Sequence, residues 1–518
     1  MAHYSLTRFL KSAFHAALQD DVSALAEFNE WKESRRLFLK QAALVATGAL
    51  LTPPLLGLAS CNDKKDKSIA IIGAGIAGLN AAYQLQKKGI SATVYEASGR
   101  IGGRMYTMNN EFGPGITTDI GGEFVDNNHK DIIDLVSELG LSFYHLKEDK
   151  LAHKTFYFGG KLLNDEDLKN AIQPFASQIW KDFKSLPEIV SYHAAAQFEQ
   201  LDRQSITGYI KSIGITGWLY DFLNVTLTRE YGMEASEQSA VNFLIMFTPP
   251  VATEKEYELF GPDHEVLKIK GGSQHLTNAL YEKVKGSVKT GYKLKAISKG
   301  SVQGYDLAFD QNEVRTTINA DMVLVAIPFT MVRQLDFNVP MPTGKRKCID
   351  EIGYGNSCKF IVGVSDKPWR NHGSKGYTFT DMDFGAGWDS SQMQSEKEGS
   401  FTVFGGGNFG DKVLNGNDDV LTGEVISSVN TIYPGMDKAF NHRTKKFCWV
   451  SNPYSKAAYS SFKAGQWSTL AGWEGVPVEQ IYFAGEHVSR EFQGYMNGGA
   501  QTGKAAVELM MKSIAQHS

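Results

Sequence analysis

The chain has 518 residues, of which 42% are hydrophobic and 21% are charged, and this composition is typical of a folded globular protein rather than a disordered one. The formal net charge of −4 provides no basic surface for phosphates, so we expect no nucleic-acid partner. No cluster of His and Cys indicates a metal site, and the four cysteines lack C-x-x-C spacing and do not indicate a disulfide scaffold.

The first sixty residues resemble an export signal. The adjacent Arg35 and Arg36 precede a mainly apolar run that is too short and too interrupted by proline to span a membrane comfortably, an order that resembles a twin-arginine signal. The run ends in Leu-Ala-Ser-Cys, which resembles a bacterial lipobox with Cys61 as the lipidated residue. We therefore expect residues 1–60 to be a signal and the mature protein to be lipid-anchored on the periplasmic or cell-surface face of a bacterial membrane. An ordinary N-terminal helix is the alternative, and the stretch before Ser34 receives no assignment.

A dinucleotide-binding fingerprint follows. Residues 68–72 form a short apolar strand, and Gly73-x-Gly75-x-x-Gly78 opens a helix with an apolar face of helical spacing. The first glycine permits the tight turn, the second lets the backbone approach a pyrophosphate, and the third permits close packing of helix and strand. Glu96 ends the next strand, where a carboxylate accepts hydrogen bonds from both ribose hydroxyls. The strand, helix and acid together predict dinucleotide binding.

The residues after Glu96 indicate which dinucleotide is bound. Residues 99–104 read Gly-Arg-Ile-Gly-Gly-Arg, a second glycine and arginine loop for which a nicotinamide site has no obvious need. This loop resembles the FAD-binding motif of the flavin amine oxidase family. The resemblance implies that Arg104, next to Gly103, lies by the pyrophosphate.

Two further segments resemble the same family. Residues 117–125 read TTDIGGEFV and match the family's Asp-x-Gly-Gly segment, whose glycine backbone passes close to the flavin. Residues 481–506 resemble the closing motif, in which an acid holds the ribityl and pyrophosphate region and two later residues lie against the isoalloxazine. The residues in these implied positions are Gly121, Gly122, Glu486, Tyr495 and Met496.

The resemblance covers nearly all of residues 66–514 and implies the fold. We expect an α/β protein with a doubly wound FAD-binding domain built from separated segments and an inserted α+β substrate domain. Leu294 lies in the second of those segments and is expected against the adenine. The FAD-binding segments are expected at 66–142, 265–348 and 452–514, and the substrate-binding segments at 143–264 and 349–451.

Lys359 stands near the start of a predicted strand, in the sequence NSCKFIVGVSDKPW. Taken alone, it could lie at an exposed strand end with its ammonium in water. In the monoamine, polyamine and L-amino-acid oxidases of the family, however, a lysine in this segment reaches the flavin N5, usually through one water. The resemblance implies that catalytic role for Lys359, with a flavin edge and a water offsetting its burial.

The segment 449–467 resembles the part of monoamine oxidase that carries a flavin-linked cysteine followed by a tyrosine. Here the tyrosine is kept as Tyr459, but Ala458 stands at the cysteine position. We therefore expect FAD to be bound non-covalently. Tyr459 and Tyr495 are expected to form two aromatic walls that steer an amine toward the flavin.

The resemblance implies oxidative deamination of a primary or secondary amine, with dioxygen reduced to hydrogen peroxide. The family's amino-acid oxidases place a carboxylate-binding arginine after the Asp-x-Gly segment, whereas this chain has Glu123 and Phe124 there. Arg229 could supply that charge instead, so an L-amino-acid oxidase is the alternative. A flavin desaturase and an anchored electron-transfer flavoprotein are further alternatives, and the oligomeric state is open, with a homodimer as one candidate.

Overall fold

The computed structural model describes residues 13–14, 16–18, 67–151, 153–247, 266–311, 314–395 and 397–516. The signal features predicted at Arg35, Arg36 and Cys61 lie outside the described residues. Within these ranges no helix has both the length and the apolar character needed to cross a bilayer.

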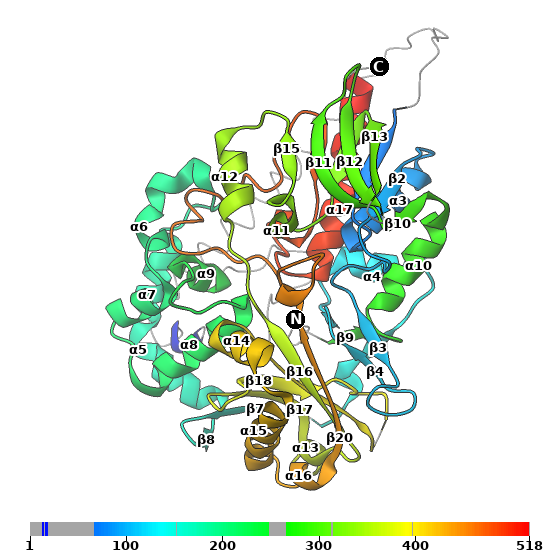
Figure 1. The fold of residues 1–518 in the computed structure, drawn as a ribbon. Helices are drawn as coiled ribbons and strands as arrows, with labels where there is room; N and C mark the ends of the chain where they lie inside the picture. Colours follow the sequence, from blue (N-terminus) through cyan, green and yellow to red (C-terminus); the bar gives the residue numbers. More distant parts are fainter. Residues whose placement is uncertain are drawn as a thin grey trace.

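A five-stranded parallel sheet forms the centre of the nucleotide-binding part, in the upper right of Figure 1. Its spatial order is β10 (Val288–Thr290), β2 (Thr93–Glu96), β1 (Ile69–Ile72), β14 (Met322–Val325) and β21 (Ile481–Phe483). All four residues of β1 and of β14 are buried, as expected for parallel strands covered on both faces. The sheet is assembled from three separated stretches of the chain, as the sequence predicted.

Different layers cover the two faces of this sheet. One face packs against helices α3 (Ile76–Lys87), α10 (Gln274–Val284) and α17 (Met496–Gln516) in a shared apolar core. The other face packs against a four-stranded sheet in which β11 (Lys293–Lys299), β12 (Tyr305–Gln311) and β13 (Val314–Ala320) form an antiparallel meander and β15 (Asp336–Asn338) pairs parallel with β11. This arrangement leaves the carboxyl ends of β1 and β2 next to the start of α3.

The remaining large sheet has seven strands and lies in the lower half of Figure 1. Its order is β20 (Phe440–Cys448), β16 (Cys358–Val364), β19 (Gly399–Gly405), β18 (Ala386–Asp389), β17 (Ser374–Thr380), β7 (His153–Phe158) and β8 (Lys161–Leu162). Helices α5 (Asp165–Lys184), α7 (Ile206–Ser212), α8 (Gly217–Tyr231) and α9 (Ala240–Leu244) lie beside it. All seven strands fall within the segments predicted for the substrate domain, whose bounds stay a prediction.

A short N-terminal piece belongs to the same core as these helices. The side chains of Ala13, Phe14, Ala17 and Leu18 are buried in it. The Phe14 ring is fully buried, and its centroid lies 4.4 Å from that of Phe247. Residues far upstream of the predicted lipobox thus pack as part of the folded protein, a role that the sequence did not reveal.

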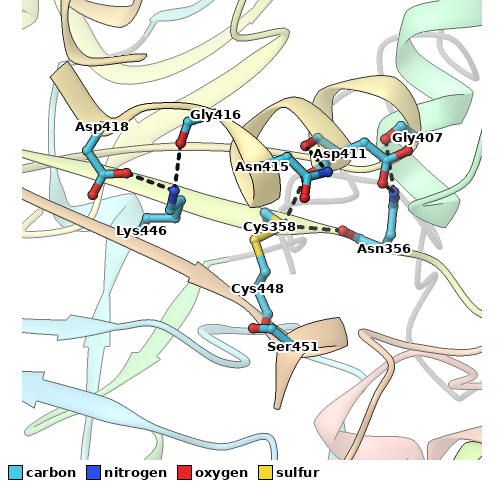
Figure 2. Close-up of a disulfide and its surroundings, with 11 residues drawn as sticks. Asn356, Cys358, Gly407, Asp411, Asn415, Gly416, Asp418, Lys446, Cys448 and Ser451 are labelled. Carbon is cyan, nitrogen blue, oxygen red and sulfur yellow. Dashed lines mark hydrogen bonds and ion pairs between the residues drawn. A yellow bond between two sulfur atoms is a disulfide. The ribbon is translucent and has the colours of Figure 1, made fainter. Parts of the chain in front are cut away.

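One disulfide joins two neighbouring strands of the seven-stranded sheet, as Figure 2 shows. Cys358 of β16 and Cys448 of β20 stand directly opposite each other, with Cα atoms 4.3 Å apart. Nothing in the sequence indicated this bond. The two cysteines are 90 residues apart, and only the antiparallel register of the two strands brings them together.

Candidate active site

One cavity of about 490 Å³ is lined by residues from both large sheets and from the loops between them. Most of the residues predicted for the site line it: Gly73, Gly75, Glu96, Gly103, Arg104, Gly121, Gly122, Leu294, Lys359, Tyr459, Glu486, Tyr495 and Met496. Gly78 and Arg229 do not line it, and Cys61 is outside the described residues. Residues from four distant stretches of the sequence are therefore gathered around one space.

The first part of the cavity is built from glycine backbone. Gly73 directly follows β1 with φ +103°, a conformation that L side chains rarely adopt. A Cβ built on Gly78 would lie 2.0 Å from the Gly73 carbonyl oxygen, so only glycine lets α3 start this close to β1. Gly75 caps α3 in an extended conformation and faces Gly103, whose Cβ would lie 3.2 Å from the Gly75 Cα. Two loops thus present bare backbone at the positive end of a helix, which suits a pyrophosphate.

Glu96 is fixed at the carboxyl end of β2. Its Oε2 accepts a hydrogen bond from the backbone N–H of Ala74 at 2.8 Å, and its Oε1 accepts from the backbone N–H and hydroxyl of Ser98. The carboxylate lines the cavity beside the glycine turn, and Leu294 of β11 lines the same cavity. The exposed backbone at the start of α3, the carboxylate of Glu96 and the apolar side chain of Leu294 together fit a dinucleotide.

Arg104 and Glu486 form a partly buried ion pair that joins the two ends of the chain's nucleotide-binding part. Arg104 Nη1 lies 2.8 Å from Glu486 Oε1 and also donates to the Ala458 carbonyl. Glu486 further accepts from Ser460 and from the backbone N–H of Gly494. Burial alone would raise the pKa of Glu486, but Arg104 and these hydrogen bonds hold it below its ordinary value. Glu486 is therefore an anion that orients the surrounding loops.

The backbone of Gly121 and Gly122 passes along the inner part of the cavity. A Cβ on Gly121 would lie 2.0 Å from the Arg104 carbonyl oxygen, and one on Gly122 would lie 2.7 Å from Met496 Cγ. Neither position has room for a side chain, and Met496 packs directly on Gly122. The structure thus brings together two segments that the sequence analysis assigned separately to the flavin.

Lys359 lies in β16 and is 3% exposed, so the alternative of an exposed strand end with its ammonium in water is wrong. Its Nζ donates to the carbonyl oxygens of Asp119 and Gly121, at 2.7 and 3.0 Å, and to Glu123 Oε2 at 2.8 Å. These acceptors use all three N–H bonds of an ammonium. The charge of Lys359 is thus offset by protein groups, and its burial needs no water or flavin edge as partner.

Glu123 is the carboxylate that sequence reasoning missed. It is fully buried and contacts Lys268 as well as Lys359. Burial by itself raises the pKa of Glu123, but the two ammonium groups outweigh this effect and lower it to about 2. Glu123 was noted only because no arginine follows the Asp-x-Gly segment. Its lysine partners lie more than a hundred residues away and leave no local pattern.

Aromatic side chains enclose the inner part of the cavity. Tyr459 is buried, its hydroxyl lies 2.9 Å from that of Ser357, and a Cβ on Gly494, the residue before Tyr495, would lie 3.5 Å from the Tyr459 ring. Burial raises the pKa of both tyrosines well above 10, so both hydroxyls stay neutral. The lining aromatic residues that were not predicted include Phe404, Phe447 and Trp449. The first two are the cross-strand neighbours of Lys359 in β19 and β20, and only the sheet register identifies them.

Arg229 has a different environment from the one that the sequence analysis considered. Its Nη1 donates to the Phe404 carbonyl, and its guanidinium lies 4.5 Å from the Phe409 ring centroid. The Gly385 and Gly405 backbone gives it room, because a Cβ on either residue would collide with the guanidinium. Arg229 is therefore packed behind the strand that carries Phe404 and does not line the cavity.

A family model described as "Flavin containing amine oxidoreductase" matches residues 76–511. The chain belongs to this family. Among its relatives, an amine oxidase [flavin-containing] of Oncorhynchus mykiss is 25% identical over an alignment of 487 residues that covers 86% of this chain and 86% of that protein. An L-amino-acid oxidase of Sistrurus catenatus edwardsii is 22% identical, over 85% of this chain and 86% of that protein. The fold resembles that of wild-type putrescine oxidase bound to putrescine, with a TM-score of 0.75, 19% identity and coverage of 86% and 99% of the two chains. The protein is thus a flavin-dependent oxidoreductase that acts on amines.

Proposed function

We propose that the protein is an FAD-dependent amine oxidase that oxidatively deaminates a primary or secondary amine and reduces dioxygen to hydrogen peroxide. The observation that carries this proposal is the cavity, in which dinucleotide-binding loops, a buried lysine and two neutral tyrosines line one space. When bound, the flavin would accept a hydride equivalent, that is two electrons and one proton, from the amine, which loses a second proton as the imine forms; dioxygen would then take up two electrons and two protons to give hydrogen peroxide.

The protein's own residues orient the amine, exclude water from the cavity and supply a positive charge. The rings of Tyr459 and Tyr495 offer faces that attract an amine nitrogen without donating a proton to it at neutral pH. The lining Phe404, Phe447 and Trp449 exclude water from the same end. Lys359 adds a fixed ammonium, held by three acceptors, next to the backbone of Gly121.

Two features of the cofactor belong to this proposal: it is FAD, and it is not covalently attached. The carboxylate of Glu96 at the end of β2 suits a ribose, and Ala458 lines the cavity where a flavin-linked cysteine would be needed. Acid precipitation of the purified protein should release the yellow colour into the supernatant, and the released flavin should be identified as FAD by chromatography. Colour retained in the pellet would contradict the proposal.

The cavity favours amines without a carboxylate. Of the described arginines that line it, Arg104 is paired with Glu486, and Arg100 donates to the carbonyls of Ile101, Gly103 and Met105. Arg229 is packed elsewhere. Amino acids stay the second candidate, because L-amino-acid oxidases are among the relatives.

A peroxide assay tests this function. The purified yellow protein should produce hydrogen peroxide with members of a panel of aliphatic and aromatic amines, and the matching L-amino acids should react more slowly. Faster reaction with the amino acids would favour the second candidate. Reduction of the flavin without peroxide would indicate an electron-transfer flavoprotein instead.

We further propose export by the twin-arginine route and lipid anchoring at Cys61. The Cys358–Cys448 disulfide supports this proposal, because such bonds persist mainly in oxidising compartments outside the cytosol. Replacing Arg35 and Arg36 with lysine should leave the precursor in the cytoplasm, and Cys61→Ser should release the protein from membranes. An unchanged distribution in cell fractionation would contradict the corresponding step.

A further inference from the structure

Two buried lysines share one buried carboxylate beside the cavity. Glu123 precedes β5 (Phe124–Val125) and is fully buried. Its Oε2 accepts from Lys359 at 2.8 Å, and its Oε1 accepts from Lys268 of β9 (Leu267–Ile269) at 2.6 Å. Lys268 is itself only 3% exposed and also donates to the Ser390 carbonyl. Three charges are thus held in one row inside the protein.

The order of these charges determines the electrostatic field in the cavity. A carboxylate in direct contact with Lys359 largely cancels the field of that ammonium, because opposite charges this close act at a distance as a dipole. Lys268 on the other oxygen restores a net charge of +1 for the row. Asp119 is the other carboxyl nearby and accepts from Thr107 and from Ser273 just before α10, while burial and the charge of Glu123 raise its pKa.

Lys268 and Glu123 do not line the cavity, whereas Lys359 does. They can therefore influence a bound group only through Lys359 and through their charge. We propose that Glu123 and Lys268 are positioning residues for Lys359, in which Glu123 fixes the ammonium and Lys268 balances Glu123 so that the site keeps a net positive charge. This inference rests on the function proposed above.

The reduction potential of the bound flavin provides a direct measure of that charge, because a nearby positive charge favours the reduced flavin, which is more negative. Lys268→Met should make the potential more negative. A change of about tenfold in the reduction equilibrium, expected for one charge at this distance, corresponds to about 30 mV for a two-electron couple. The rate of reoxidation by dioxygen should fall by about tenfold as well.

The decisive variant removes the charges of both Glu123 and Lys268. In Glu123→Gln/Lys268→Met, Lys359 alone carries the charge of the row, so the net charge equals that of the parent. Its potential should return to the parent value, although two buried side chains have changed. Lys268→Arg should also keep the parent potential. Lys270→Met is the matched control, because Lys270 lies just beyond the same strand and is exposed.

A parent-like potential in Lys268→Met would overturn the proposal and indicate that Lys268 has only a structural role. A double variant whose potential is shifted further than that of Lys268→Met would also overturn it. If Lys268→Met does not fold, Glu123→Gln decides instead, because it leaves two ammonium groups without their carboxylate and should make the potential more positive than that of the parent; an unchanged potential would overturn the proposal. The potential is measured by chemical reduction against a reference dye and needs no substrate, so it tests the charge arrangement even if no amine reduces the parent and the proposed function fails.

Discussion

The two ends of the cavity recognise charge in different ways. At the nucleotide end, backbone N–H groups at glycine turns and the carboxylate of Glu96 are bonded to near neighbours in sequence, and the charge of Arg104 is offset by its ion pair with Glu486. At the inner end, the polar groups are full charges on Lys359, Glu123 and Lys268, buried and bonded across the sequence.

This difference separates binding from chemistry. Backbone N–H groups at a helix start carry fixed partial charges that hold an anion well, and they cost little to bury. Buried full charges require complete compensation, and they are found where a potential or a reaction rate has to be set. We therefore expect changes at the nucleotide end to alter flavin retention, and changes at the inner end to alter rates in a protein that still holds flavin.

The largest effect is expected at the glycine turn. Gly78→Ala places a methyl group 2.0 Å from the Gly73 carbonyl oxygen, which α3 and β1 cannot both accommodate. We expect a loss of about 3 kcal/mol or more in stability and protein without flavin. Gly75→Ala is the matched control, because the nearest atom to its Cβ is the Gly103 Cα at 3.9 Å. It should retain little flavin but keep the melting temperature of the flavin-free parent, and a Gly75→Ala protein less stable than the flavin-free parent would contradict this distinction.

The next largest effect concerns Lys359 and should spare flavin retention. A positive charge near the site where dioxygen accepts an electron stabilises the anion that forms, by roughly 2–4 kcal/mol in a poorly solvated pocket, or about 30- to 1000-fold in rate. Lys359→Met should therefore load FAD, be reduced by amine at a similar rate and reoxidise slowly, as followed by stopped-flow absorbance. Parent-like reoxidation would remove this role, and loss of FAD would show that Lys359 is structural.

A smaller effect is expected at Glu96. Glu96→Ala leaves the Ala74 N–H without its carboxylate acceptor and removes the acceptor for ribose hydroxyls, at a cost of about 1–3 kcal/mol in FAD affinity. Titration of the apoprotein with FAD gives the dissociation constant. The rates of the two half-reactions at saturating FAD should be unchanged. Slow reoxidation in this variant would contradict the view that the nucleotide end affects flavin retention and the inner end affects rates.

The last effect is a pH dependence at His487, which follows Glu486 and lies outside the cavity lining. Burial lowers the pKa of His487 to about 3 from 6.5, and in the described structure neither ring nitrogen has a hydrogen-bond partner. Because the unfolded chain binds this proton more readily, stability is full above pH 6.5 and falls by about 1.4 kcal/mol per pH unit as the pH drops toward 3. Urea unfolding at pH 7 and pH 5 should show a smaller loss in His487→Phe than in the parent. Equal losses of stability in the two proteins would contradict the conclusion that the buried His487 imidazole is neutral in the folded state.

The nucleotide end could be predicted from the sequence because its geometry is local. Gly73, Gly75 and Gly78 are needed by one turn, and Glu96 ends the adjacent strand, so spacing alone determines their relative positions. The family resemblance placed Lys359 and the two tyrosines at the inner end, and the structure gathers them in one cavity.

The partners of those residues could not be predicted, because they depend on tertiary contacts. The oxygens of Glu123 meet lysines that are 145 and 236 residues away, and no local pattern encodes either contact. The Cys358–Cys448 pair depends on strand register in the same way. Arg229 was considered as a charge for the substrate because of its residue type, whereas packing against Gly385 and Gly405 determines its position.

Phe14 lies upstream of the predicted lipobox, yet its ring is part of the core around Phe247. In the uncut chain this contact is intramolecular, so the segment is presented to its site at a high effective concentration. Cleavage before Cys61 would turn the same contact into a bimolecular one, and the segment would then stay only as long as its own affinity holds it. Cleavage would thereby lower the fraction of molecules in which the segment occupies the apolar site around Phe247, because the segment could diffuse away. The residues that form the site would stay the same.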